Sequence, residues 1–232
     1  MKIVVTGASR GIGYELVKQL SLNADNTIYA ISRNIEKLEQ LKKDCANRNV
    51  VTIACDLSDE KSIQTLILEL KKHTSTINAL VNNAGALVNK PFSTISSADL
   101  EYVFNVNVFS VVQLIQGVMP MLDEKVKSHI VNISSMGGFQ GSAKFSGLSA
   151  YSSSKAALVC LTECLSEEFK ERNIAFNCLA LGAVQTEMLN EAFPGYKAPI
   201  SSPEMAFYIA DFVVNAHKMM NGRIIPVTLS TP

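Results

Sequence analysis

Tyr151 and Lys155 are the residues of this 232-residue chain whose types and spacing most directly suggest chemistry. Residues 151–170 show a helical pattern, and a spacing of four places both side chains on one helix face, one turn apart. An isolated phenol titrates at about pH 10, and a neighbouring ammonium favours the phenolate and lowers the phenol pKa. The pair is therefore a candidate acid/base unit, although Tyr and Lys at this spacing also occur by chance on solvated helices.

A glycine-rich segment near the N-terminus predicts a dinucleotide site. The residues Thr6-Gly7-Ala8-Ser9-Arg10-Gly11-Ile12-Gly13 follow an apolar run at residues 2–5 and open a helical pattern. Glycines in such a turn let the backbone approach a pyrophosphate, and the N–H groups and positive dipole of the next helix favour its negative charge. The spacing is Gly-x3-Gly-x-Gly. Such a segment can also be a purely structural turn, but the strand–turn–helix context favours nucleotide binding.

Two arginines indicate which dinucleotide is bound. NAD sites usually carry an Asp or Glu about 20 residues past the glycines, where the carboxylate binds ribose hydroxyls. This chain has Ser32 followed by Arg33 at that place, and Arg10 lies within the glycine-rich turn. Because two guanidiniums without a carboxylate suit a 2′-phosphate, the sequence predicts NADP(H) over NAD(H). The alternative is that both arginines are solvated surface groups.

Polar residues after two further predicted strands extend the same site. Asp56 is placed to accept a hydrogen bond from an adenine amino group, or to cap the helix that follows it. Asn82-Asn83-Ala84-Gly85 follows the next strand, at the carboxyl edge where open α/β sheets bind ligands. An Asn-rich turn is also a common structural device, so neither segment decides the function alone.

Short apolar runs alternate with helical patterns along the chain. Strands are predicted at residues 2–5, 27–31, 50–54, 79–81, 129–133, 175–179 and 223–227, and helices at residues 14–20, 35–44, 59–72, 109–119 and 151–170, with one more beginning near residue 203. Ser58 is the expected N-cap of the helix at residues 59–72. This alternation predicts an α/β fold with a parallel sheet, right-handed crossovers and helices on both faces. No linker or internal repeat divides residues 1–232, so we expect one domain.

Composition disfavours several classes of partner. The net charge is zero, with 21 acidic and 21 basic residues and no basic block, which argues against nucleic-acid binding. Met1 leads directly into an apolar strand, which leaves no room for a signal peptide. The apolar region at residues 108–122 is interrupted by polar residues, Gly117 and Pro120, and is expected to be a buried helix and not a membrane span.

The five cysteines are an odd number without a disulfide-like rhythm. Cys160 and Cys164 share a helix face, but no Cys or His lies near them in sequence to complete a metal site. We therefore expect the cysteines to be buried and to pack as small hydrophobic residues, without a bound metal. Free thiols also suggest the reducing environment of the cytoplasm.

Taken together in this order, the glycine-rich turn, residues 82–85 and the Tyr151–Lys155 pair resemble the short-chain dehydrogenase/reductase family over residues 2–227. The resemblance implies a Rossmann-type, doubly wound, seven-stranded parallel sheet. It also implies that Tyr151 is the catalytic acid/base, and that Lys155 lowers the Tyr151 pKa and holds the nicotinamide ribose.

The resemblance assigns two further catalytic positions. Ser135 corresponds to the serine that hydrogen-bonds the substrate oxygen, with Ser134 as the neighbouring candidate. Asn107 corresponds to the residue that supports a proton-relay water, with Asn105 as its competitor. The implied cofactor contacts are Gly7, Ser9, Arg10, Gly11, Ile12, Gly13, Ser32, Arg33, Asp56, Leu57, Asn83, Ala84, Gly85, Tyr151, Lys155, Gly182, Val184 and Thr186, of which Thr186 is the expected carboxamide partner.

Three departures from the family pattern stand out. Leu181-Gly182 replaces a common Pro-Gly, which suggests a less rigid turn. Residues 137–150 form a longer Gly- and Ser-rich stretch, expected at the rim of the substrate pocket. Residues 228–232 replace the family's usual C-terminal ending, which puts the common tetramer in doubt, so a homo-oligomer is expected, with a dimer preferred.

These features predict an NADP(H)-dependent oxidoreductase that acts on a small carbonyl or alcohol substrate. Residues 137–150 and 186–199 supply apolar side chains that suit an apolar or aromatic ketone, namely Phe139, Phe145, Met188, Leu189, Phe193 and Tyr196. Within the family, the alternative is a 3-oxoacyl-carrier-protein reductase. From another class, the alternative is a non-catalytic NADP-binding sensor or scaffold.

Overall fold

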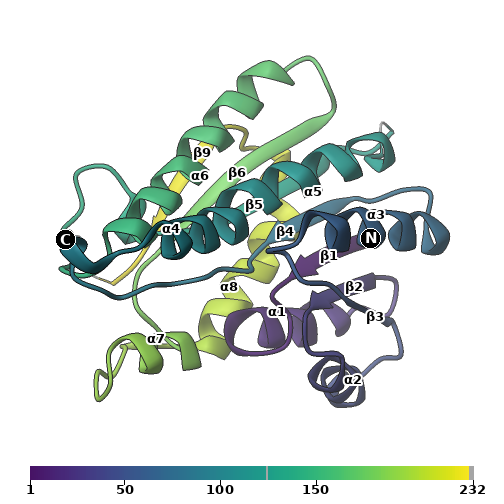
Figure 1. The fold of residues 1–232 in the computed structure, drawn as a ribbon. Coiled ribbons are helices and arrows are strands. Elements are labelled where there is room, and N and C mark those ends of the chain that lie inside the picture. Colours follow the sequence, from purple (N-terminus) through teal and green to yellow (C-terminus); the bar gives the residue numbers. More distant parts are fainter. Residues whose placement is uncertain (124, 230–232) are drawn as a thin grey trace.

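The protein is described by a computed structural model that covers residues 1–123 and 125–229. Seven parallel strands form the main sheet in the order β3-β2-β1-β4-β5-β6-β9 (Figure 1). Their bounds are β1 Lys2–Thr6, β2 Thr27–Ser32, β3 Val50–Ala54, β4 Ala79–Asn82, β5 Ser128–Ser135, β6 Ile174–Leu181 and β9 Arg223–Val227. The predicted α/β fold with a doubly wound, seven-stranded parallel sheet is confirmed.

Helices cover both faces of this sheet, as the parallel topology requires (Figure 1). One face packs against α1 Gly11–Ser21, α2 Ile35–Asp44 and α8 Ser202–Asn215. The other face packs against α3 Glu60–His73, α5 Ser110–Val118 and α6 Ser149–Glu168. The strands read as nearly continuous apolar runs because both of their faces are buried.

Two short parallel strands, β7 Val184–Gln185 and β8 Ile200–Ser201, form a separate sheet that the sequence did not predict. Between them lies α7 Glu187–Ala192, in a segment expected to be loop. Each of these elements is too short to show a periodic apolar pattern.

The predicted helix at residues 109–119 is part of a longer helical run. It begins with α4 Ser97–Phe104, passes through a π-helical turn at Asn105–Phe109, and continues as α5. In the described part of the chain, this run, Ser97–Met121, is the one helix long and apolar enough to cross a membrane by length and composition. The α5 part packs its apolar side chains against α3 and the sheet, which accounts for that composition.

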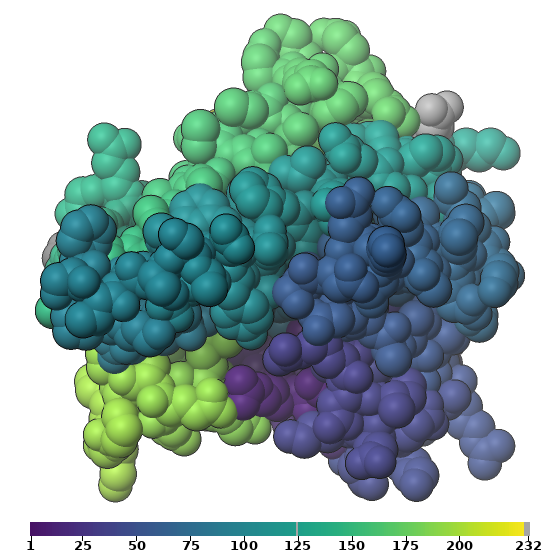
Figure 2. All heavy atoms as spheres, viewed as in Figure 1, coloured from purple at the N-terminus to yellow at the C-terminus, as the bar shows by residue number. Residues whose placement is uncertain are grey.

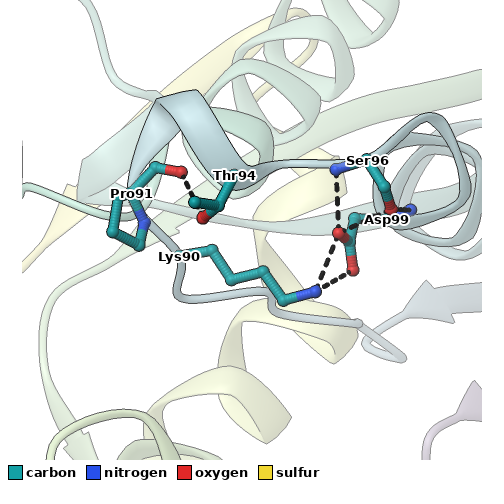
Figure 3. Close-up of polar contacts among 5 residues, drawn as sticks. All are labelled: Lys90, Pro91, Thr94, Ser96 and Asp99. Atoms are coloured by element: carbon teal, nitrogen blue, oxygen red, sulfur yellow. Dashed lines mark hydrogen bonds and ion pairs between the residues drawn. The ribbon is translucent and has the colours of Figure 1, made fainter.

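A capping box starts α4. Ser96 Oγ accepts a hydrogen bond from the Asp99 backbone N–H, and the Asp99 side chain accepts one from the Ser96 backbone (Figure 3). Lys90 Nζ contacts the same carboxylate at 2.7 Å, and together these groups lower the Asp99 pKa to about 2. The Ser-x-x-Asp sequence was the available signal for this unpredicted helix.

Two sequence expectations about single residues are wrong. The N-cap of α3 is Asp59, whose carboxylate accepts from the Lys61 and Ser62 N–H groups, while Ser58 donates its hydroxyl to Asp56.

Cys160 and Cys164 are exposed and not buried as expected, because α6 buries a different stripe, Ser154, Lys155, Leu158 and Thr162. The expectation drawn from the C-terminal segment falls partly on residues 230–232, which lie outside the described residues.

His129 is fully buried on β5, and its two ring nitrogens have defined partners. Nδ1 lies 3.0 Å from the Val213 carbonyl, so it carries the proton, and Nε2 lies 3.0 Å from Asn177 Nδ2, so it accepts. The orientation of the Asn177 amide is fixed because its Oδ1 accepts a hydrogen bond from the Arg223 N–H, which a flipped amide would lose. Burial lowers the His129 pKa from 6.5 to about 4.

Acidification should therefore destabilise the protein through His129. The unfolded chain takes up a proton below about pH 6.5 that the folded chain resists until about pH 4. The contribution of His129 to the free energy of unfolding is therefore fully present above about pH 6.5. It is lost as the pH falls toward about 4, by up to about 3 kcal/mol. Urea unfolding of wild type and His129→Gln across this range should show a flatter pH dependence in the variant. His73→Gln, at a partly exposed histidine, is the control and should keep the wild-type slope.

Candidate active site

A cavity of about 520 Å³ lies at the carboxyl edge of the sheet. Figure 2 shows a hollow in which the N-terminal segment lies between the yellow-green segment that contains α7 and the teal helix α4. Apart from Asn107, every residue predicted to bind the cofactor or to act in catalysis lines this cavity. The chain thus gathers into one place residues that lie up to 179 positions apart, from Gly7 to Thr186.

Contacts from the β4 end hold the glycine-rich turn in shape. Asn83 Nδ2 donates to the carbonyls of Thr6 at 2.9 Å and Gly7 at 3.3 Å, and its backbone N–H donates to Thr6 Oγ1. Gly7 has a φ of +69°, and a Cβ there would lie 2.8 Å from the Ala84 Cα. The amide of Asn83 is therefore a positioning group for the turn, although the residue also borders the cavity.

The start of α1 suits a pyrophosphate. Arg10 is the N-cap residue and provides no side-chain cap, so the first N–H groups of the helix remain for another acceptor. A Cβ at Gly13 would press on the Gly7 carbonyl and the Asn83 amide, so only glycine permits this closeness of turn and helix. Ser32 donates its hydroxyl to Ser9 at 2.7 Å, which joins the turn to the end of β2.

The adenosine end of the cavity has an acceptor and a cation. Asp56 uses one carboxylate oxygen for the Ser58 N–H and hydroxyl, which leaves the other oxygen for a ligand. Burial raises the Asp56 pKa, but the Ser58 hydrogen bonds and the Arg33 charge outweigh burial and lower it. Leu57 and Arg33 border the same end. The residues present therefore fit an adenine amino group and a nearby phosphate.

Ser135, Tyr151 and Lys155 form the opposite end of the cavity. The Ser135 hydroxyl forms a hydrogen bond with Tyr151 that lowers the Tyr151 pKa. Lys155 Nζ donates to the Ile133 carbonyl at 2.7 Å and lies 5.9 Å from the centre of the Tyr151 ring. Ser134 instead donates its hydroxyl to the Lys155 carbonyl at 2.9 Å and is buried. This geometry favours Ser135 over Ser134, because adjacent strand residues point to opposite faces.

The expected direction of the Tyr151 pKa is wrong for the protein alone. Burial raises the Tyr151 pKa, and the hydrogen bond with Ser135 offsets this only in part. Burial also lowers the Lys155 pKa to about 8, and the charge of Cys178 opposes this shift. Desolvation is thus the main cause of the raised Tyr151 pKa, and the Lys155 ammonium donates its hydrogen bond to the Ile133 carbonyl.

Asn107 is fully buried in the π-helical turn and fixes the loop after β4. Its Oδ1 accepts from the Ala86 N–H at 2.8 Å, and its Nδ2 donates to the Ala86 carbonyl and to Ser154 Oγ, both at 2.9 Å. A Cβ on Gly85 would lie 3.6 Å from both Asn107 Oδ1 and Lys155 Nζ, so the two side chains flank this glycine. These contacts favour Asn107 over the partly exposed Asn105.

The segment after β6 closes the cavity near the catalytic end. Gly182 donates its N–H to the Val227 carbonyl at 2.9 Å, and Val184 is buried at the start of β7. Thr186 caps α7, since its Oγ1 accepts from the Leu189 N–H at 3.2 Å. Its hydroxyl proton remains available to an amide oxygen of a ligand.

Sequence reasoning did not identify part of the pocket wall. Of the six side chains expected to shape the pocket, five line the cavity and Phe139 does not. Leu87, Tyr102 and Val106, from the β4 loop and the helical run that includes α4, also line it. Phe145 and Phe193 meet edge to face, with ring centres 6.5 Å apart. These apolar residues lie outside the recognised motifs, so no local signal marked them.

The family model for short chain dehydrogenase matches residues 1–197. This chain belongs to the short-chain dehydrogenase family. Among similar members is a 3-oxoacyl-[acyl-carrier-protein] reductase of Aquifex aeolicus, 32% identical over 188 residues that cover 80% of this chain and 74% of that protein. A benzil reductase of Saccharomyces cerevisiae is 31% identical over 194 residues, covering 80% of this chain and 72% of that protein.

A solved structure also matches this chain along nearly its whole length. The RhlG/NADP active-site complex of Pseudomonas aeruginosa superposes with a TM-score of 0.84 at 25% identity, covering 97% of this chain and 94% of that one. The predicted family is therefore confirmed, and the predicted nicotinamide cofactor agrees with this similar structure.

Replacing Asn107 should destabilise this protein. Asn107→Ala leaves the buried Ala86 N–H and carbonyl without partners, which should lower the free energy of unfolding by about 2–4 kcal/mol. Asn105→Ala is the matched control and should cost less than about 1 kcal/mol. Urea unfolding measures both, and an equal or larger loss in Asn105→Ala would reverse the assignment.

Proposed function

We propose that the protein is an NADP(H)-dependent carbonyl reductase, with Tyr151 as its acid/base. The observation that carries the proposal is one continuous cavity with Ser135, Tyr151 and Lys155 at one end and the glycine-rich turn and Arg33 at the other. A dinucleotide bound with its phosphates at the glycine-rich turn could direct its nicotinamide toward the Ser135 and Tyr151 hydroxyls.

The protein's part in the reaction is to polarise the substrate and supply a proton. A bound nicotinamide carries the hydride chemistry. The Ser135 and Tyr151 hydroxyls donate hydrogen bonds to the substrate carbonyl oxygen, where negative charge grows in the transition state. Tyr151 then gives its proton to that oxygen, and a raised phenol pKa keeps the hydroxyl protonated beforehand. Lys155 and Asn107 hold the surrounding groups in place.

The substrate class follows from the lining of the catalytic end. The pocket walls there are Leu87, Tyr102, Phe145, Leu148 and Phe193, which are apolar or aromatic. Burying an unpaired charge against such walls is costly, so an uncharged apolar or aromatic ketone is the favoured substrate. The similarity to a benzil reductase supports this class, since benzil is an aromatic diketone.

A 3-oxoacyl-carrier-protein reductase is the second candidate, supported by the relative of that name. We further propose that the chain acts as one domain, in the cytoplasm, as a homo-oligomer. A non-catalytic NADP-binding role is disfavoured because all four catalytic positions hold the residues that the chemistry requires.

Tyr151→Phe should lower kcat/KM for ketone reduction by about 10²–10⁴-fold, because it removes the proton donor. NADPH oxidation with a panel of aromatic ketones, diketones and a 3-oxoacyl thioester measures this loss, and NADPH binding should persist. Tyr208→Phe, at an exposed position of α8, is the control and should keep full activity. Undiminished turnover in Tyr151→Phe removes Tyr151 from its role, and tight NADPH binding without any turnover by wild type indicates a sensor.

Arg33→Ala should reduce the preference for NADPH over NADH. A charge-assisted hydrogen bond to a phosphate contributes about 1.5–3 kcal/mol, so the ratio of the two kcat/KM values should fall about 10- to 100-fold. Arg48→Ala, at an exposed arginine in the loop before β3, is the control and should leave the ratio unchanged. An unchanged ratio in Arg33→Ala contradicts the assignment of Arg33 to the 2′-phosphate.

A further inference from the structure

An ion pair joins the glycine-rich turn to α7. Arg10 Nη1 and Glu191 Oε1 lie 2.6 Å apart, although 181 positions separate the two residues. Arg10 is the N-cap residue of α1, beside the first N–H groups of that helix. The carboxylate of Glu191 thus lies at one of the two guanidiniums, Arg10 and Arg33, that the sequence predicts for a 2′-phosphate.

The helix that carries Glu191 has few other attachments. None of the six residues of α7 is buried. At its C-terminal end, Asn89 Nδ2 donates to the Ala192 carbonyl at 2.9 Å. Near its middle, Asn190 Oδ1 accepts from Gln185 Nε2 at 2.6 Å. A short helix held by exposed polar contacts opens at low free-energy cost, so one ion pair can alter how often it opens.

We infer that Glu191 is a specificity-determining residue that competes with the cofactor's 2′-phosphate for Arg10. The inference rests on the proposed preference for NADP(H). A phosphate at Arg10 brings two like-charged groups to one guanidinium, and the more weakly held one, the carboxylate on α7, leaves. Binding of the phosphorylated cofactor therefore frees α7, whereas a dinucleotide without the 2′-phosphate leaves the ion pair intact.

The exposure of the pair limits the size of this effect. The side chains of Arg10 and Glu191 are 40% and 63% exposed. Exposed ion pairs contribute at most about 1 kcal/mol. Removing the competitor should therefore tighten phosphate binding by about twofold to fivefold, which corresponds to about 0.4–1 kcal/mol.

The test compares two adenosine ligands by calorimetry on the full chain at low salt. Adenosine 2′,5′-bisphosphate carries the 2′-phosphate, and adenosine 5′-monophosphate lacks it. Glu191→Gln should bind the bisphosphate about twofold to fivefold more tightly and the monophosphate unchanged. The gain should vanish in the Arg10→Gln background, and it should vanish in wild-type Arg10 at about 0.5 M salt because exposed charges are then screened.

Two control variants separate competition from other causes. Glu187→Gln removes a carboxylate from the same helix. An equal gain in affinity for the bisphosphate in this variant would show that any negative charge on α7 has the same effect, and would overturn the inference. Asn89→Ala loosens α7 without changing its charge, so an equal gain there would assign the effect to opening of α7 alone and also overturn it.

Hydrogen exchange of the α7 amides gives a readout independent of affinity. In wild type, the bisphosphate should speed exchange in α7 and the monophosphate should not, while exchange in Glu191→Gln should be fast with either ligand. Unchanged α7 exchange on binding of the bisphosphate overturns the inference.

Failure of the inference can be told from failure of the proposed function. If Arg10→Gln weakens bisphosphate binding but Glu191→Gln leaves it unchanged, the preference for NADP(H) stands and the role of Glu191 falls. If wild type binds both ligands equally, the cofactor preference itself is wrong.

Discussion

Parallel pairing of β1, β4, β5 and β6 is the constraint on which the site depends. In a parallel sheet all carboxyl ends meet at one edge, and here that edge collects Thr6, Asn82, Ser135 and Leu181. The chain turns away in opposite directions on the two sides of β1, toward β2 and toward β4, which leaves a crevice between them. The glycine-rich turn lies in this crevice, and Asn83 from the neighbouring strand holds it.

The catalytic end depends on the close approach of α6 to the end of β5. Gly138 allows this approach, because a Cβ there would lie 2.6 Å from the Ala156 nitrogen. The approach buries Lys155 against the Ile133 carbonyl and brings Tyr151 to Ser135. It also lets Asn107 reach α6 through Ser154. Packing of one helix on one strand end thus brings together the four residues proposed to act in catalysis, and the glycine-rich turn is positioned separately.

Burial has opposite consequences for the two titrating groups of this site. Desolvation disfavours the charged form of each, so it raises the pKa of Tyr151 and lowers that of Lys155. The raised pKa favours the protonated form of the Tyr151 phenol. The spacing of Tyr151 and Lys155 correctly predicts their place on one helix, but it does not reveal the burial that raises the Tyr151 pKa.

The sequence by itself determined the strand order along the chain, the turn at Gly7–Gly13 and the helical spacing of Tyr151 and Lys155, because apolar periodicity and glycine placement are local properties. It also narrowed the serine and asparagine choices to two neighbours each. Only the tertiary structure shows that Ser134 bonds the Lys155 carbonyl whereas Ser135 bonds Tyr151, since this depends on which strand face meets α6. Tertiary structure likewise decided that Cys160 is exposed and that Arg10 meets Glu191. Such pairings join segments far apart in sequence, and no local pattern encodes a contact whose partner is fixed by the packing of the whole fold.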